Sequence, residues 1–290
     1  MPDDPAARDA AEEASAFSHP AVAPDASAAY GAHPDQVVDF YAPRDGRASA
    51  PLVVALHGGA WRAPYDRQHL TPFVDFLARR GFAVASVEYR RGSDIPRQGG
   101  TAPVAGRWPE TFDDVAAALD ALPGLAAAHL PQADPRRTVL TGHSAGGHLA
   151  LWAAARHVLP AGSPWRLPAP PALRGVVALA PIAHFTRAVE LDVCGGAVTE
   201  LLGGDADLAA RAALSDPAVL LPTGIATTLV QGRTDIVVPP AVVEAYAAAA
   251  AEAGETVGCT FLEDVGHFPL IDPAADACAV VAEEIAQLAF

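Results

Sequence analysis

Lysine is absent from this sequence of 290 residues, so all 19 residues counted as Lys+Arg are arginine. The sequence also has 34 Asp+Glu residues, which gives a formal net charge of −15 at pH 7. Nucleic acids and anionic membranes repel a protein of this charge, so we expect neither as a partner. The charge does not restrict a small substrate, because a few neighbouring residues set the field at its site.

Cysteine is scarce: the sequence has only Cys194, Cys259 and Cys278. These residues show no CxxC or other metal-ligand spacing. An odd, sparse set of this kind is typical of reduced thiols in a cytosolic protein. The sequence therefore predicts no disulfide framework, no metal site and a cytoplasmic location.

Long apolar runs are missing too, because no stretch approaches the roughly 18 uninterrupted apolar residues of a membrane helix. Residues 1–20 are acidic and lack the basic region and apolar core of a signal peptide. With 51% hydrophobic and 18% charged residues, the composition is that of a globular protein. The length suits one α/β domain, and the sequence leaves the oligomeric state open.

Short apolar strands alternate with helical patterns along most of the chain. We expect strands at 37–43, 51–59, 82–90, 138–143, 175–183, 226–232 and 258–264, and helices at 67–81, 111–122, 144–158, 242–254 and 276–290. Gly81 suits a helix C-cap and Thr111 a helix N-cap. The alternation predicts an α/β fold with a mostly parallel central sheet, covered by helices on both faces.

Two segments depart from this alternation. Residues 1–35 are rich in Ala, Pro and Asp, and we expect an N-terminal arm with room for one short helix, draped over the core or partly mobile. Residues 184–224 form a long insertion between two strands, which we expect at the carboxyl edge of the sheet, where ligands bind. The sequence therefore predicts one domain, 36–290, with a small lid and a preceding arm.

The segment from Gly142 to Gly146 reads G-x-S-x-G, with Ser144 between an expected strand and an expected helix. A strand-to-helix turn of this tightness needs small residues on both sides of the serine, and it exposes the hydroxyl above the sheet. A serine that only caps a helix is the structural alternative. The context favours Ser144 as a nucleophile.

A serine hydroxyl needs a base within hydrogen-bond reach, and the base needs an orienting acid. Asp235 and His267 directly follow two late strands, and the order Ser144, Asp235, His267 is the one that a nucleophile elbow requires. We therefore predict that His267 is the base and Asp235 the acid. Asp264 and Asp272 are rivals for the acid, because they too lie near the histidine in the sequence.

Acyl transfer also needs backbone N–H groups that stabilise the negative charge on the carbonyl oxygen, by roughly 3 kcal/mol each. One N–H is expected from Ala145, the residue after the nucleophile, and another from the loop after an earlier strand. That loop contains Gly58, Gly59 and Ala60, and its two glycines let the amides turn inward. The sequence therefore predicts an oxyanion hole from these residues, with a simple Gly-Gly turn as the alternative.

The segments HGGAW, GHSAGGHLALW, GRTD and VGH follow one another in this order. With them the chain resembles the α/β-hydrolase superfamily from about Val37 to its end. HGGAW resembles the H-G-G-x-W signature of the kynurenine formamidase (arylformamidase) branch rather than the H-G-G-G of hormone-sensitive-lipase-like esterases. GHSAGGHLA is similar to that branch as well. The resemblance implies hydrolysis of an N-formyl group from an aromatic amine, such as N-formylkynurenine, without a cofactor.

Assorted bacterial carboxylesterases also contain H-G-G-x-W, so a short-acyl carboxylesterase of broad specificity is the main alternative. In either case the expected partner is a small ester or formamide substrate. A catalytically silent α/β-hydrolase that acts as a ligand receptor is a third hypothesis, but this chain retains all three triad residues. A peptidase is disfavoured because the sequence has no gating domain and only a short lid.

Several other polar and aromatic residues could take part in the site. Trp61 and Tyr65 follow the glycine loop and could wall a substrate pocket, or could pack the loop onto the core. Arg90 and Arg91 could anchor a carboxylate, although structural ion pairs are the simpler expectation. We expect His148 to be a buried, hydrogen-bonded histidine. Trp152 is expected in the core, and Glu110 to act at a helix start.

Overall fold

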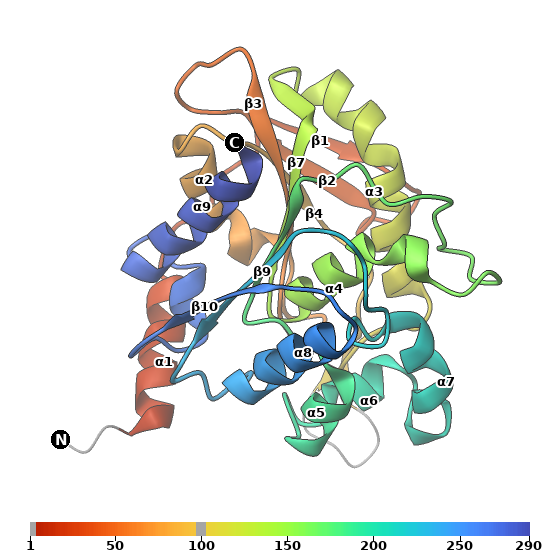
Figure 1. Cartoon of the computed structure of the whole chain (residues 1–290). Helices are drawn as coiled ribbons and strands as arrows, with labels where there is room; N and C mark the ends of the chain where they lie inside the picture. The colour runs from red at the N-terminus through yellow and green to blue at the C-terminus, as the bar shows by residue number, and fades with distance from the viewer. Residues whose placement is uncertain (1–3, 97–102) are drawn as a thin grey trace.

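The computed structural model describes residues 4–96 and 103–290 (Figure 1). Its main sheet has eight strands in the order β1-β2-β4-β3-β7-β8-β9-β10. The strands are β1 Ala26–Ala29, β2 Val37–Tyr41, β3 Ala50–Leu56, β4 Ala83–Val87, β7 Ala133–His143, β8 Gly175–Leu179, β9 Thr227–Gly232 and β10 Gly258–Leu262. All seven expected strands are present, and the fold is that of the α/β-hydrolases.

Most of the sheet is parallel, as expected. From β4 through β3, β7, β8 and β9 to β10, each strand pairs in parallel with its neighbour. Only β2 against β4 and β1 against β2 are antiparallel. Strands β3, β4 and β8 are buried along their whole length, because both faces of the sheet are covered, and this explains their continuous apolar sequences.

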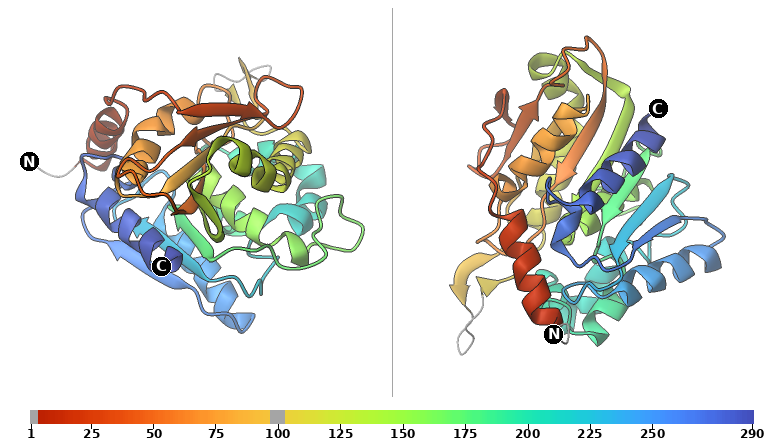
Figure 2. Two further views of the ribbon diagram at one scale, coloured as in Figure 1. Left: turned by 90° about the horizontal axis from the view of Figure 1, so that it is seen from above. Right: turned by 90° about the vertical axis from the view of Figure 1, so that its left-hand side faces the viewer.

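Helices cover both faces of the sheet (Figure 2). Leu52, Val54 and Leu56 of β3 pack in one core with α3 Glu110–His129, α4 Ala145–Ala154 and α8 Pro240–Glu252. Val53 and Ala55 of the same strand pack in the other core with α2 Thr71–Arg79 and α9 Asp276–Ala289. Alternate side chains of one strand thus enter opposite cores, as the pleat of a strand requires.

The N-terminal segment differs from the expected arm in one respect. It contains one short helix, α1 Pro5–Ala16, with Asp4 as the N-cap. It also contributes strand β1, whose residues pair with β2 from Ala29↔Val37 to Ala26↔Phe40. The sequence ASAA has no strand propensity of its own. Pairing with the edge of β2 supplies the hydrogen bonds that make it a strand.

Helix α3 is longer than expected and starts differently. It begins at Glu110 and continues through Pro123 to His129. Thr111 is therefore not the N-cap: it lies in the first turn, and its hydroxyl donates to the carbonyl oxygen of Arg90 at 2.7 Å. The expected helix stopped at residue 122, whereas the observed helix continues through Pro123, although proline usually ends a helix. Glu110 is the first residue of the helix, where its charge suits the helix dipole.

The insertion between β8 and β9 is helical. It contains α5 Phe185–Glu190, α6 Ala197–Leu201 and α7 Asp205–Ser215. A small two-stranded sheet, β5 Ser93–Pro96 with β6 Pro103–Val104, lies before α3. Short 3₁₀ turns complete the elements at η1 Arg67–Leu70, η2 Arg156–Val158 and η3 Phe268–Leu270. Within residues 4–96 and 103–290, no helix has the length and apolar character needed to cross a membrane.

Candidate active site

Ser144 occupies the tight turn between β7 and α4. Its backbone has φ 56° and ψ −118°, a strained conformation for a residue with a side chain. A Cβ at Gly142 would overlap the carbonyl of Gly146, and a Cβ at Gly146 would overlap the carbonyl of Leu56. Both flanking positions therefore require glycine, as the sequence pattern indicates. The turn has the geometry of a nucleophile elbow.

His267 and Asp235 form a direct contact. Nδ1 of His267 lies 2.7 Å from Oδ2 of Asp235, and both residues are buried. Oδ1 of Asp235 accepts the N–H groups of Val237 and Val238, each at 2.8 Å, and Oδ2 also accepts from Nε2 of Gln231 at 3.1 Å. These bonds fix the carboxylate, which in turn fixes the imidazole ring.

The two rival acids are used differently. Asp272 accepts from the hydroxyl of Ser15 at 2.6 Å and lies 2.7 Å from Nε2 of His19. In the described part of the chain no hydrogen bond joins Asp264 to His267. The structure thus brings Asp235, and neither rival, to the histidine.

Ser144 and His267 line the same cavity, which has a volume of about 200 Å³. His143 lines this cavity as well, and its ring centroid is 4.3 Å from that of His267. Nε2 of His143 donates to the carbonyl oxygen of His267 at 3.0 Å. Burial lowers the pKa of His143 well below its ordinary value, so this ring is neutral and acts as a fixed donor.

The glycine loop lies next to the elbow. Gly59 and Ala60 line the cavity with Ser144, and both have positive φ, 100° and 51°. A Cβ at Gly58 would lie 2.8 Å from the carbonyl oxygen of His143 and 3.3 Å from Cβ of Ser144. Its missing side chain lets the loop approach the elbow.

The predicted oxyanion-hole amides are not used elsewhere. Among the described residues, the N–H groups of Gly58, Gly59, Ala60 and Ala145 have no hydrogen-bond acceptor. Ala145 is the first residue of α4, so its amide also lies at the positive end of the helix dipole. An oxyanion hole needs unpaired amides of this kind beside the nucleophile, so these four stay its candidates.

A buried ionic network holds the start of the glycine loop, and the sequence interpretation missed it. Nε2 of His57 lies 2.8 Å from Oε1 of Glu88, which also accepts from Nη1 of Arg91 at 2.8 Å. Burial alone would raise the pKa of Glu88. The neighbouring His57 and Arg91 outweigh this effect and lower the pKa to about 2. Tyr89 stacks on His57 with ring centroids 4.2 Å apart. The sequence feature that could have revealed this network is Glu88, a glutamate that directly follows the buried apolar strand β4.

The two aromatic candidates for the substrate pocket lie in different places. Tyr65 lines the cavity. Trp61 does not: it is completely buried and packs edge-on against His148 and Phe185, with ring centroids 5.1 and 6.4 Å away. Of the two alternatives left open for Trp61, the structure shows packing onto the core. Trp152 is in the core, as expected.

The expectation for His148 is confirmed, because the residue is buried and its Nε2 donates to the carbonyl oxygen of Ser215 at 2.9 Å. Other cavity residues were not foreseen. Phe17, Arg62, His69, Cys194, Val237, Phe268 and Ile271 complete the wall. Burial lowers the pKa of His69 to about 3, so this imidazole is neutral. Phe17 comes from the N-terminal segment, where no sequence pattern marked it.

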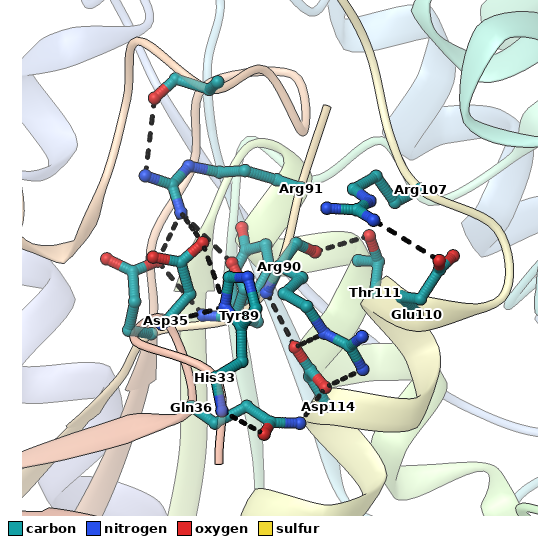
Figure 3. Close-up of polar contacts among 12 residues, drawn as sticks. His33, Asp35, Gln36, Tyr89, Arg90, Arg91, Arg107, Glu110, Thr111 and Asp114 are labelled. Atoms are coloured by element: carbon teal, nitrogen blue, oxygen red, sulfur yellow. Dashed lines mark hydrogen bonds and ion pairs between the residues drawn. The ribbon is translucent and has the colours of Figure 1, made fainter. Parts of the chain in front are cut away.

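Arg90 and Arg91 form structural ion pairs rather than a carboxylate anchor (Figure 3). Arg90 binds Asp114 with two side-chain nitrogens, Nε to Oδ2 at 2.8 Å and Nη2 to Oδ1 at 2.7 Å. Arg91 pairs with Glu88. Gln36, the residue before β2, also donates to Asp114 at 2.7 Å, so this carboxylate joins the start of β2 to α3. In the part of the chain that the structure describes, no group of three or more His, Cys, Asp or Glu could hold a metal ion.

Comparisons with known structures agree with the fold. A carbohydrate esterase from gut microbiota superposes with a TM-score of 0.72 at 18% identity, over 93% of this chain and 99% of that chain. Esterase B from Lactobacillus rhamnosis superposes with a TM-score of 0.72 at 22% identity, over 98% and 90% of the two chains. At these identities the likeness concerns the fold.

Comparisons with curated sequences are local. The chain is 32% identical over 108 residues to a probable carboxylic ester hydrolase, LipM, of Mycobacterium tuberculosis, which is 37% of this chain and 22% of that protein. It is 32% identical over 127 residues to a probable isoprenylcysteine α-carbonyl methylesterase of Oryza sativa subsp. japonica, 44% of this chain and 27% of that protein. The chain therefore matches only a minor part of each relative.

The family comparison covers far more of the sequence. The model of the BD-FAE family matches residues 38–248, a stretch that includes the glycine loop, the elbow serine and Asp235. His267 lies beyond the matched stretch, on the loop after β10. Since the match spans most of the chain, the protein belongs to the BD-FAE family.

Proposed function

We propose that this protein is a serine carboxylesterase that hydrolyses small esters with short acyl groups. The main support is the contact of His267 with Asp235 beside a cavity that also contains the elbow serine Ser144. The names of similar proteins favour the same activity, because those compared above are ester hydrolases. The cavity volume of about 200 Å³ favours a short acyl group over a long one.

In this proposal Ser144 is the nucleophile. His267 takes the proton from its hydroxyl as the oxygen attacks the ester carbonyl, and it then gives that proton to the leaving alcohol. Asp235 holds the imidazole and stabilises the imidazolium that forms. The amides of Ala60 and Ala145 stabilise the oxyanion. Water then attacks the acyl-enzyme, again with His267 as the base, and the carboxylic acid leaves.

Formamide hydrolysis by the same residues is the competing reaction. The HGGAW sequence at residues 57–61 favours it through its resemblance to kynurenine formamidases. The relatives and similar structures named above are esterases, and this favours ester hydrolysis over formamide hydrolysis. A non-catalytic receptor is disfavoured, since the acid, the histidine and the serine are all present.

Substrate comparison tests the proposal. We would measure kcat/KM for nitrophenyl acetate, butyrate and octanoate and for N-formylkynurenine, with Ser144→Ala as the control. We expect the short esters to be turned over fastest and the formamide at background. A formamide rate above all ester rates would instead identify a formamidase. A wild-type protein that neither turns over any of these compounds nor reacts with a fluorophosphonate probe would be a receptor.

We also propose that the protein works in a reducing compartment such as the cytoplasm. The support is that Cys194, Cys259 and Cys278 are all free thiols. Cysteine thiols of a secreted protein would more often be paired.

A further inference from the structure

The N-terminal helix α1 places an aromatic side chain in the candidate active site. Phe17, the residue after the last turn of α1, lines the cavity that contains Ser144 and is 37% exposed. Its ring lies 6.4 Å from that of Tyr65, 5.5 Å from that of His69 and 5.6 Å from that of Phe268, between centroids. These four side chains form an aromatic wall, to which α1 contributes one member.

Two hydrogen bonds join α1 to the loops of the catalytic pair. Oε1 of Glu12 accepts the backbone N–H of Gly266 at 3.2 Å, one residue before His267. Nη2 of Arg8 donates to the backbone carbonyl of Thr234 at 3.2 Å, one residue before Asp235. The helix thus bridges the loop after β9 and the loop after β10. Figures 1 and 2 show α1, in red, beside the blue C-terminal part of the chain.

Gly266 leaves room for the Glu12 carboxylate. A Cβ at Gly266 would overlap the carboxylate oxygen Oε2 of Glu12, so any other residue there would displace this carboxylate from its bond to the Gly266 N–H. At the end of α1, Ser15 bonds to Asp272, which also contacts His19. Phe17 lies between these two residues in the sequence, so its position is fixed on both sides.

Helix α1 contacts the catalytic loops more than it packs into the core. Among the residues of the helix only Ala16 is buried. Apolar burial by α1 therefore contributes little to the stability of the fold, compared with its polar contacts to the catalytic loops. A helix with this distribution of contacts is suited to shaping the site.

From these contacts we propose that Phe17 is a specificity-determining residue that limits the length of the substrate chain in the cavity, and that Glu12 holds α1 in the position from which Phe17 does so. The proposal rests on the ester hydrolysis proposed above. It gives the N-terminal segment a role in substrate selection. Truncation of the Phe17 ring removes one side of the aromatic wall and lengthens the cavity.

The test is the ratio of kcat/KM for nitrophenyl octanoate to that for nitrophenyl acetate. We expect Phe17→Ala to raise this ratio by about tenfold, since pocket contacts of one or a few methylenes discriminate by at least that factor. Phe17→Trp should lower the butyrate-to-acetate ratio. The matched control is Phe290→Ala, because Phe290 is 72% exposed and contacts Phe82 and Arg137 instead of cavity residues. This variant should leave both ratios unchanged.

A second pair of variants tests the anchor. Glu12→Ala should shift the octanoate-to-acetate ratio in the same direction as Phe17→Ala, whereas Glu13→Ala, with the same change of charge on the same helix, should not. An unchanged ratio in a folded Phe17→Ala variant, or an equal change for all esters, overturns the proposal.

A binding measurement keeps this test separate from the test of ester hydrolysis. We would compare the Tm shifts that ethylboronic and octylboronic acid produce in the wild type and in Phe17→Ala. The proposal expects a larger gain for the octyl compound in the variant. Equal shifts in both proteins overturn it, whether or not the wild type hydrolyses esters.

Discussion

Asp235 holds Nδ1 of His267 at 2.7 Å across 32 positions of sequence. The contact is possible because β9 and β10, the strands that precede these residues, are parallel neighbours that end at the same edge of the sheet. With Nδ1 engaged, Nε2 is the ring nitrogen left for a reaction at the cavity. The pair has the geometry of the acid and base in a serine hydrolase.

Asp235→Asn should lower kcat by about 10⁴-fold with little change in KM, because the amide no longer favours the required tautomer or stabilises an imidazolium. Steady-state kinetics with nitrophenyl acetate measure the effect, and Tm reports on folding. Asp272→Asn is the control, since this rival acid contacts Ser15 and His19 instead. We expect it to change kcat less than tenfold. A loss in Asp272→Asn as large as that in Asp235→Asn would contradict the assignment.

Gly146→Ala should destabilise the fold by at least about 2 kcal/mol, because the new Cβ overlaps the carbonyl of Leu56 and the elbow cannot relax away from β3. Denaturant unfolding measures the change. Gly124→Ala is the matched control, since nothing lies within 4 Å of its Cβ position and the residue is exposed in α3. It should stabilise the protein by about 0.5–1 kcal/mol through helix propensity. Equal effects of the two substitutions would refute the steric argument.

Asp114→Ala should cost about 3 kcal/mol in the free energy of unfolding, because Asp114 is completely buried and its removal leaves Arg90 without a counter-ion. Glu190→Ala removes an exposed partner of Arg187 and should cost less than about 1 kcal/mol. Chemical denaturation of both variants at one ionic strength gives the comparison. Equal losses in the free energy of unfolding for Asp114→Ala and Glu190→Ala would contradict this prediction.

The buried His148 should make stability depend on pH. Burial lowers its pKa to about 4 in the folded protein, against 6.5 as its ordinary value. Between pH 6.5 and pH 4 the unfolded chain therefore binds a proton at this residue, whereas the folded chain does not. The free energy of unfolding falls as the pH drops through this range. Between pH 6.5 and pH 5 the loss from this residue is about 2 kcal/mol.

His148→Gln retains a donor toward Ser215 and removes the titration. The free energy of unfolding of this variant, relative to the wild type, should therefore improve by about 2 kcal/mol between pH 7 and pH 5. Urea unfolding at the two pH values measures the difference. A pH-independent difference would show that His148 is not neutral in the folded state.

The features that the sequence predicted well depend on local constraints. The elbow at Ser144 needs glycine at fixed positions, and buried parallel strands need apolar runs, so both leave a local pattern. Asp235 and His267 could be paired from their positions after late strands, since strands of a parallel sheet end at one edge. This reasoning needs no knowledge of distant contacts.

The features that it missed depend on contacts between distant segments. β1 is a strand only because β2 offers it an edge, and Phe17 reaches the cavity only because Glu12 and Ser15 find partners more than 250 positions away. The two alternatives for Trp61 could not be separated from the sequence, because its packing partners His148 and Phe185 are distant in the chain. Glu88 lies beside His57 through the pairing of β3 with β4.

The position of β10 has a consequence for inactivation. This strand lies at one margin of the sheet and is partly exposed. Within residues 4–96 and 103–290 its one pairing partner is β9, and the loop after it contains His267. Marginal strands detach at a lower free energy than central ones, so this strand is able to separate while the interior of the sheet stays intact. Mild heating or dilute denaturant should therefore abolish esterase activity before the circular dichroism of the protein changes. Cooling or dilution should restore the activity without global refolding.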